Sequence, residues 1–391
     1  MYDFETLVER RQFDSNKWLG MDEKHPGLAP EIVPFSIADM EFKNAPEIIS
    51  GLQEFLETAI LGYTRAGSGY LQAVADWMER RHHWKIQTEW ICQSIGVVPA
   101  LINAVLAFTD PGDGVILMPP VYFPFYDAVE KHGRVVVKNT LIERNGRFEI
   151  DFDDLERCVK NPRNKLLLFC SPHNPVGRVW TEEELLRVGE LCIENQVLMV
   201  SDEIHFDLIM PGFHHTVLAS LSGDFAEHCI TCTSPSKTFN LAGMQVSNII
   251  ISNEALRRRF IAQMEHAGHF GLSILGYKAC ELAYTRGENW LEALLPVIAE
   301  NAAFVEQFMA ENIPEIRVFP LEGTFLQYWD CRSLGLDYRA LSKLMTEEAL
   351  IFMDEGYLFG EEGQGFERMN LACPKWVLEQ ALERLKKALG R

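Results

Sequence analysis

Three side chains with complementary chemistry each follow a short apolar segment of the sequence: Asn174, Asp202 and Lys237. The three segments span residues 165–169, 197–200 and 228–233. Their aliphatic and β-branched residues predict strands that are buried on both faces of a mostly parallel sheet. Ligands of such sheets bind beyond the carboxyl ends of the strands. If the three strands are neighbours, an amide, a carboxylate and an amine therefore meet at one edge.

An amine, a carboxylate and an amide together suit a ligand that has an aldehyde, a basic ring nitrogen and a phenolate oxygen. Lys237 could bond to the aldehyde, Asp202 could keep a pyridine nitrogen protonated, and Asn174 could donate to the phenolate. Pyridoxal 5′-phosphate has these three groups, and its electron-accepting power depends on the protonated nitrogen. Taken singly, the residues also have ordinary interpretations: a turn, a helix cap and a solvated surface lysine.

Helices alternate with strands over most of the chain and must position these side chains. We expect helices at 70–84, 99–108, 123–132 and 181–195, and further strands at 115–118, 134–137 and 246–251. The last of these helices begins with Thr181 and Glu184, which have the spacing of a capping box. The alternation predicts an α/β architecture. Only about a dozen residues separate the last two strands, which favours an antiparallel join between them.

The two ends of the chain differ from this alternating part. Prolines punctuate the first fifty residues, which predicts an irregular segment laid over a surface. Beyond residue 287, the expected elements are a long helix at 290–312, a strand within 323–330 and a helix at 376–389. We therefore predict an N-terminal arm that joins the small domain, a large α/β domain and a small α+β domain, with bounds at 1–50, 51–286 and 287–391.

The composition excludes several classes of function. The chain has 391 residues, of which 36 are basic and 56 acidic, giving a formal charge of −20. An acidic surface repels phosphate backbones and anionic lipids, so neither nucleic acid nor a membrane is expected as a partner. No segment has the ~18 continuous apolar residues of a membrane span. Nine cysteines and no secretory signal pattern predict reduced thiols in a cytoplasmic protein.

Two other groups of residues carry no predicted site. Cys229 and Cys232 have C-x-x-C spacing but lie within one predicted buried strand, without a second such pair to complete a zinc site, so we interpret them as core cysteines. The histidine pairs at 82–83 and 214–215 lack a metal-binding motif, and we expect them to be surface residues. No metal is predicted.

Three motifs give the sequence a family resemblance. S-P-S-K-T-F-N-L-A-G at 234–243, N-P-V-G-R at 174–178 and S-D-E-I-H at 201–205 resemble the fold-type-I pyridoxal-phosphate enzymes, the aspartate aminotransferase superfamily. The chain is most similar to the MalY/PatB subgroup of cystathionine β-lyase-like C–S lyases. Supporting motifs are A-D-M-E-F (38–42), G-Y-T-R (62–65), G-V-V-P-A-L (96–101), P-P-V-Y (119–122), G-T-F-L (323–326) and R-M-N-L-A (368–372).

The resemblance implies a fold and an assembly. The large domain would hold a mostly parallel seven-stranded sheet flanked by helices, which is the fold of type I pyridoxal-phosphate transferases. The chain would form a homodimer with shared active sites, in which Tyr63 reaches the partner's phosphate. Its partners would be a small amino-acid substrate and a second copy of itself.

The resemblance also implies roles around the cofactor ring. Lys237 would carry pyridoxal 5′-phosphate and act as the general base at the substrate Cα, and Asp202 would pair with the pyridine nitrogen. Asn174 and His205 would donate to the phenolate oxygen. The aminotransferases of the family usually have tyrosine at the position of His205, whereas the lyase subgroup resembles this chain. Tyr122 would stack on the ring.

The cofactor's phosphate needs a separate set of donors. The backbone N–H groups of Val97 and Val98, at a helix N-terminus after Gly96, would bind it, and Ser234 would add a hydroxyl. Aminotransferases usually have an arginine eight residues after the lysine, where this chain has Gln245. That departure weakens the aminotransferase interpretation and leaves the lyase interpretation intact.

The substrate would be held by a third set of residues. Arg368 would clamp the α-carboxylate with bidentate hydrogen bonds that a lysine could not reproduce, with Asn174 and Tyr122 beside it. Asp39 would shape the mouth of the cavity. The expected reaction is β-elimination from cystathionine or a cysteine derivative, releasing a thiol, pyruvate and ammonia. The alternatives are a class I/II aminotransferase and, in another class, a non-catalytic protein that uses the bound cofactor as a sensor.

Overall fold

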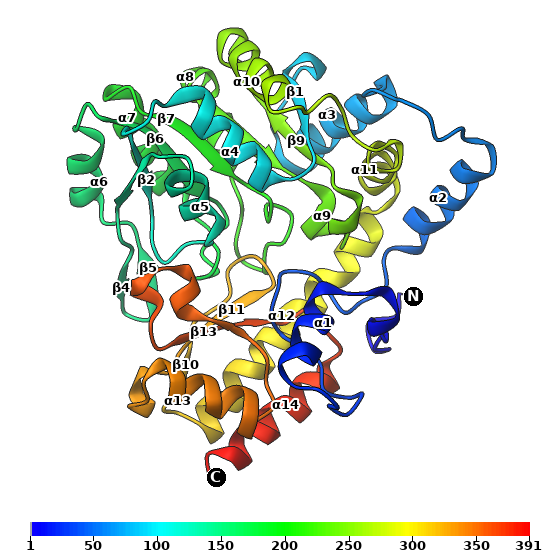
Figure 1. Cartoon of the computed structure of the whole chain (residues 1–391), viewed down its shortest axis with the longest axis vertical. Coiled ribbons are helices and arrows are strands. Elements are labelled where there is room, and N and C mark those ends of the chain that lie inside the picture. Colours follow the sequence, from blue (N-terminus) through cyan, green and yellow to red (C-terminus); the bar gives the residue numbers. More distant parts are fainter. Residues whose placement is uncertain (1) are drawn as a thin grey trace.

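The computed structural model describes residues 2–391 and contains a large sheet above a smaller one (Figure 1). The large sheet comprises β1 (Ile91–Ser94), β2 (Gly114–Leu117), β3 (Val135–Lys138), β6 (Asn164–Cys170), β7 (Leu198–Asp202), β8 (Cys229–Thr233) and β9 (Ser247–Ile250). Their spatial order is β1-β9-β8-β7-β6-β2-β3. The five strands from β3 to β8 pair in parallel, while β9 pairs antiparallel with β8 and β1. The predicted mostly parallel seven-stranded sheet and the predicted antiparallel join are confirmed.

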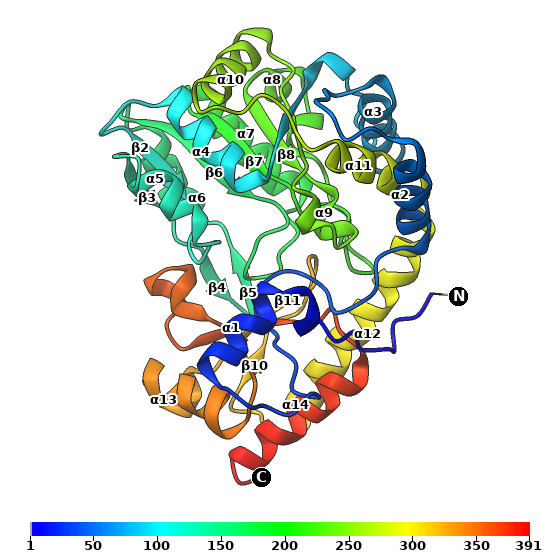
Figure 2. The same cartoon turned by 45° about the vertical axis from the view of Figure 1, so that its right-hand side comes forward.

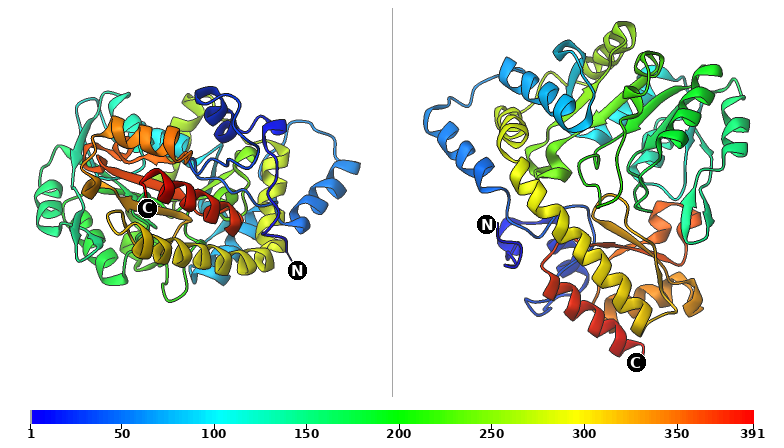
Figure 3. Two further views of the ribbon diagram at one scale, coloured as in Figure 1. Left: turned by 90° about the horizontal axis from the view of Figure 1, so that it is seen from below. Right: turned by 180° about the vertical axis from the view of Figure 1, so that it is seen from behind.

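Helices cover both faces of the large sheet (Figures 1 and 3). The helices that pack around it are α3 (Ser68–His82), α4 (Val97–Phe108), α5 (Pro124–Glu130), α6 (Phe152–Val159), α7 (Glu182–Glu194), α10 (Glu254–His266) and α11 (Ile274–Arg286). The residues of α4, α5 and α10 share one apolar cluster with strand residues, and those of α3, α6, α7 and α11 belong to a second, larger cluster. The predicted capping box of α7 is present, because Thr181 and Glu184 exchange side-chain-to-backbone hydrogen bonds.

The smaller sheet is antiparallel throughout. Its strands are β10 (Arg317–Val318), β11 (Leu326–Asp330), β13 (Phe366–Asn370) and β12 (Asp354–Glu355), in that spatial order. The helices of this part are α12 (Glu288–Asn312), α13 (Tyr338–Lys343) and α14 (Lys375–Ala388), and α12 and α14 lie side by side (Figure 3). A separate hairpin, β4 (Ile142–Arg144) and β5 (Arg147–Glu149), lies between the two sheets (Figure 2). The domain bounds given above stay a prediction.

The N-terminal segment is more ordered than its prolines suggest. It contains the helix α1 (Asn16–Lys24), whose Trp18 is fully buried, and the beginning of α2 (Pro46–Thr58). The backbone of 35–41 then runs beside the smaller sheet: the N–H of Asn370 donates to the carbonyl of Phe35 at 2.9 Å. This contact places residues 37–39 near the carboxyl ends of the strands of the large sheet.

The cysteines match their expected burial. All nine are free, and all but Cys158 are buried, including Cys229 and Cys232 within β8. Over residues 2–391, none of the helices combines the length and the apolar character needed to cross a membrane. The expectation of surface histidines is wrong for two of them, because His82 and His215 are buried beneath the large sheet, each against a carboxylate.

Candidate active site

A cavity of about 390 Å³ lies beyond the carboxyl ends of β6, β7 and β8. The sequence-predicted residues that line it are Val97, Val98, Tyr122, Asn174, Asp202, His205, Lys237 and Arg368. They come from both sheets and from the loops and helix starts between them, and the N-terminal segment closes one wall with Ile37 and Ala38. The structure therefore brings together the amide, the carboxylate and the amine, as the order of the strands predicted.

Lys237 projects into the cavity from the short helix α9 (Pro235–Thr238), which follows β8. Its Nζ donates to the backbone carbonyl of Ala38 at 2.7 Å. Burial lowers the pKa of Lys237 to about 8, although the carboxylates of Asp39 and Asp202 favour its charged form. A lysine with this pKa has a substantial neutral fraction near neutral pH, and only the neutral amine can act as a nucleophile or a base.

Asp202 is the last residue of β7 and is 4% exposed. Its Oδ1 accepts a hydrogen bond from the Ile204 N–H at 3.1 Å. Burial raises the pKa of Asp202 to about 7, against the opposing effects of that hydrogen bond and of Lys237. A carboxylate buried with so little compensation is costly unless a proton or a cation lies against it. The position is therefore suited to a ligand that brings a protonated nitrogen.

Arg368 is held rigidly at the opposite side of the cavity. Its Nη1 donates to Oδ1 of Asn174 at 2.8 Å, and its Nη2 forms an ion pair with Asp354. The guanidinium also lies over the ring of Phe359, 4.8 Å from its centroid. Because the Asn174 oxygen is engaged by Arg368, the side-chain NH₂ of Asn174 is the group left to donate to a ligand.

The start of α4 offers backbone donors to the same cavity. Gly96 is the N-cap, and Val97 and Val98 are the first two helical residues. The first N–H groups of a helix have no partners within the helix, and together with the helix dipole they form an anion site. No side chain caps this end. Gln245, at the position where aminotransferases usually have arginine, also lines the cavity.

The two serines of the S-P-S-K motif occupy different positions. Ser234 is the N-cap of α9; its Oγ donates to the carbonyl of Val246 at 2.7 Å and accepts from the Ser236 N–H at 3.0 Å. Ser234 is not among the residues that line the cavity, whereas Ser236 is. The phosphate contact of Ser234 stays a prediction. Ser236 was not predicted as a site residue, although it stands in the same S-P-S-K motif, directly before Lys237.

Tyr122 and His205 complete the walls on either side. Burial raises the pKa of Tyr122, which keeps its hydroxyl protonated. Burial lowers the pKa of His205 well below its ordinary range, so its imidazole is neutral. The Nδ1 atom of His205 is buried without a hydrogen-bond partner, which an enclosed polar atom rarely tolerates. His205 therefore has one ring nitrogen available for a ligand.

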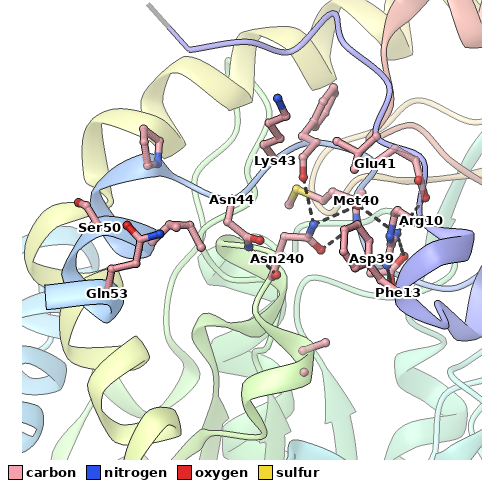
Figure 4. A pocket seen from close by; sticks show the side chains of 16 residues that line it. Arg10, Phe13, Asp39, Met40, Glu41, Lys43, Asn44, Ser50, Gln53 and Asn240 are labelled. Atoms are coloured by element: carbon pink, nitrogen blue, oxygen red, sulfur yellow. Dashed lines mark hydrogen bonds and ion pairs between the residues drawn. The ribbon is translucent and has the colours of Figure 1, made fainter. Parts of the chain in front are cut away.

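Two predicted residues lie outside this cavity. Tyr63 sits in the connection between α2 and α3, and its side chain is fully exposed. Asp39 lines a neighbouring cavity of about 650 Å³, where its Oδ2 pairs with Arg10 Nη2 at 2.7 Å (Figure 4). Although burial acts to raise it, the pKa of Asp39 is lowered by Arg10 and by the charge of Lys17. The roles predicted for Tyr63 and Asp39 stay predictions.

The fold and this site are those of a family that comparison with known proteins identifies. The family model described as aminotransferase class I and II matches residues 30–385, and the chain belongs to this family.

Individual relatives match over their whole length. The chain is 41% identical to cystathionine beta-lyase PatB of Bacillus subtilis (strain 168) over 99% of this chain and 100% of the relative. It is 32% identical to Protein MalY of Escherichia coli (strain K12), covering 100% of this chain and 99% of MalY. Cystalysin from Treponema denticola, whose crystal structure contains a pyridoxal 5′-phosphate cofactor, superimposes with a TM-score of 0.98 at 48% identity, covering 100% and 99% of the two chains. The resemblance to the superfamily and to its MalY/PatB subgroup is confirmed.

Proposed function

We propose that this chain is a pyridoxal-phosphate-dependent C–S β-lyase that acts on cystathionine and related cysteine derivatives. The observation that carries the proposal is that Lys237 and Asp202, whose side chains differ in charge, line one cavity that also contains Arg368. The similarity to cystathionine beta-lyase PatB supports the reaction, and the similarity to cystalysin supports the cofactor.

The residues present fit pyridoxal 5′-phosphate. When bound, this cofactor supplies an aldehyde carbon and a pyridine ring that accepts electron density from the substrate Cα. Asp202 would hold a proton at the ring nitrogen and so relieve its own burial cost. The N-terminus of α4 would receive the phosphate, and the imidazole of His205 and the free NH₂ of Asn174 would face the phenolate side.

The remaining steps fall to the chain's own side chains. Arg368 binds the α-carboxylate and fixes the orientation of the amino acid. The neutral amine of Lys237 takes the proton from Cα, and its lowered pKa makes the neutral form more accessible near neutral pH than it is for an ordinary lysine. Tyr122, which lines the same cavity, would pack on the ring. Loss of the thiol from Cβ, with uptake of one water, gives pyruvate, ammonia and the thiol.

The deciding experiment is incubation of the purified holoenzyme with L-cystathionine in the absence of any 2-oxo acid. Catalytic release of pyruvate and thiol is the expected result. Turnover that requires a 2-oxo acid would instead establish an aminotransferase, which shares every step up to removal of the Cα proton. A protein that binds the cofactor but turns over no amino acid would be the non-catalytic sensor. Lys237→Ala serves as the inactive control.

We further propose a cytoplasmic homodimer in which Tyr63 completes the partner's phosphate site. The full exposure of the Tyr63 ring supports this, because a large aromatic side chain at the surface suits an interface. The test mixes two inactive variants, Tyr63→Ala and Lys237→Ala. If sites are shared, mixed dimers contain one wild-type site and activity returns; if each chain builds its own site, the mixture stays inactive.

A further inference from the structure

One charged residue of the cavity is left without a role in the proposed reaction. The charged side chains that line the cavity are Lys237, Asp202, Arg368 and Asp354. The first two serve the cofactor, and Arg368 serves the α-carboxylate. Asp354, in β12, pairs directly with Arg368 of β13 in the register of the smaller sheet.

Asp354 lies at the boundary between the cavity and an adjoining surface groove. Three residues, Ile37, Asp354 and Leu358, line both the substrate cavity and an adjoining groove of about 790 Å³. The groove runs between α1 and α13, and its lining includes Tyr338, which is exposed.

The substituent of a substrate is left with the part of the cavity lining that the cofactor does not occupy. The walls formed by Asp202 and His205, by the start of α4 and by Tyr122 are taken by the cofactor under the proposed function. Two walls are left: one at Ala242 and Gln245, where the cavity adjoins the neighbouring cavity of about 650 Å³, and one at Ile37, Asp354 and Leu358, where it adjoins the groove. Asp354 is the ion-pair partner of Arg368, so a sulfur substituent that extends toward the groove from an amino acid held by Arg368 passes Asp354.

The carboxylate of Asp354 is fixed in place at this wall. Its Oδ2 accepts from the backbone N–H of Ile37 at 2.9 Å and pairs with Nη2 of Arg368. Ile37 has a φ of 50°, a left-handed conformation that a β-branched residue rarely adopts, so the surrounding contacts must hold it there. The side chain of Asp354 is 15% exposed, and within residues 2–391 its hydrogen bonds engage Oδ2 and leave Oδ1 without a donor.

We propose that Asp354 sets the charge selectivity of the site for the substituent on the substrate sulfur. This inference rests on the proposed function and adds a specificity-determining residue to it. A fixed carboxylate in a partly buried wall attracts a cationic group and repels an anionic one, and the effect is larger there than in open water. The site should favour cysteine derivatives whose arm ends in an ammonium and reject those whose arm ends in a carboxylate.

A matched series of three substrates tests the proposal with the holoenzyme. S-methyl-, S-(2-aminoethyl)- and S-carboxymethyl-L-cysteine share the reacting atoms and differ in the charge of the arm. For the wild type we expect kcat/KM for pyruvate release to be highest with the ammonium arm and lowest with the carboxylate arm. Asp354→Asn should reduce the ratio of kcat/KM for the ammonium-arm substrate to kcat/KM for the carboxylate-arm substrate by about tenfold or more. Removal of the negative charge weakens the attraction of the first arm and relieves the repulsion of the second.

The control variant is Glu355→Gln. It removes the same charge one residue away, from a side chain that lines the groove but not the cavity, and the ratio should stay near the wild-type value. If Asp354→Asn lowers kcat/KM for all three substrates in parallel, Asp354 only supports Arg368 and the proposal is overturned. If the wild type releases no pyruvate from any of them, the proposed function fails. The selectivity is then read from the three dissociation constants, measured by titrating the holoenzyme's cofactor absorbance.

Discussion

Replacement of Asp202 by asparagine should stabilise the cofactor-free protein above neutral pH. Burial raises the pKa of Asp202 in the folded chain to about 7, from an ordinary value of 3.8. The folded state therefore binds the proton more tightly than the unfolded state does. Below pH 4 both states are protonated and the carboxyl costs nothing, whereas above pH 7 the folded protein must bury an ionised group.

The size of the effect follows from the two pKa values. Each tenfold change in proton affinity is worth about 1.4 kcal/mol, so a pKa difference of about 3 corresponds to about 4 kcal/mol at high pH. Between pH 5 and pH 8 the cost grows by about 2–3 kcal/mol. The charged groups that act on Asp202 are Lys237, which lowers its pKa, and Glu203, which raises it. Asparagine keeps the hydrogen-bond acceptor for the Ile204 N–H without the charge.

Urea unfolding of the cofactor-free wild type and of Asp202→Asn at pH 5 and pH 8 measures this. The stability advantage of the variant should grow by about 2–3 kcal/mol over that interval. Asp76→Asn, which neutralises an exposed carboxyl on α3, serves as the control and should show no such growth. The reasoning would be refuted if the difference in free energy of unfolding between the wild type and Asp202→Asn were the same at pH 5 and at pH 8. In the holoenzyme the same substitution should weaken cofactor binding and activity, because the ring nitrogen loses its partner.

Three further substitutions separate the roles of other residues. Lys237→Ala should abolish the cofactor's covalent attachment, seen in the absorbance spectrum, and reduce pyruvate release at least about 10³-fold, since anchor and base are lost together. Arg368→Lys should raise KM for amino-acid substrates about 10–100-fold with a smaller change in kcat, because an ammonium cannot bind a carboxylate bidentately; an unchanged KM would remove Arg368 from the clamp. Thr181→Ala should lower the free energy of unfolding by about 1 kcal/mol through loss of the capping box, with kcat/KM unchanged.

The large sheet could be predicted from sequence because its central strands are apolar without interruption. Residues 166–170 of β6 and 229–233 of β8 are all buried, so both faces of these strands are covered, and their sequences show a short run of β-forming residues. The edge strand β1 carries no such pattern: Ile91–Ser94 is short and includes Gln93, and it forms because β9 is there to pair with it. The helix α1 was missed for a similar reason, since it buries Trp18 in the larger apolar cluster, which is assembled from distant parts of the chain.

Asn174, Asp202 and Lys237 could be predicted because each stands at or just beyond the end of a central strand. The ends of neighbouring parallel strands meet at one edge of the sheet, so the sequence position of each residue indicates its place in the fold. The cavity residues that were missed depend on long-range contacts. Asp354 reaches the cavity because β12 pairs with β13, and Ile37 reaches it because the N-terminal segment lies beside the smaller sheet. Neither residue stands in a motif, and no local pattern distinguishes Asp354 from the neighbouring Glu355.

The segment after β7 shows why residue type alone could not assign roles. Within six residues it carries three acids and a histidine, and only Asp202 and His205 line the cavity. Glu203 turns away and pairs with His215 at 2.9 Å, while Asp207 accepts from His82 and from Thr238, each at 2.7 Å.

Those pairings explain the two histidines that sequence reasoning placed at the surface. A buried carboxylate needs donors, and His82 and His215 supply them beneath the sheet. Thr238 is the residue after Lys237, so its hydrogen bond to Asp207 ties the lysine's helix to the strand end that presents Asp202. The Asp207 carboxylate that makes this link is not part of the cavity that contains Lys237 and Asp202; it lines a separate pocket together with His82 and His215.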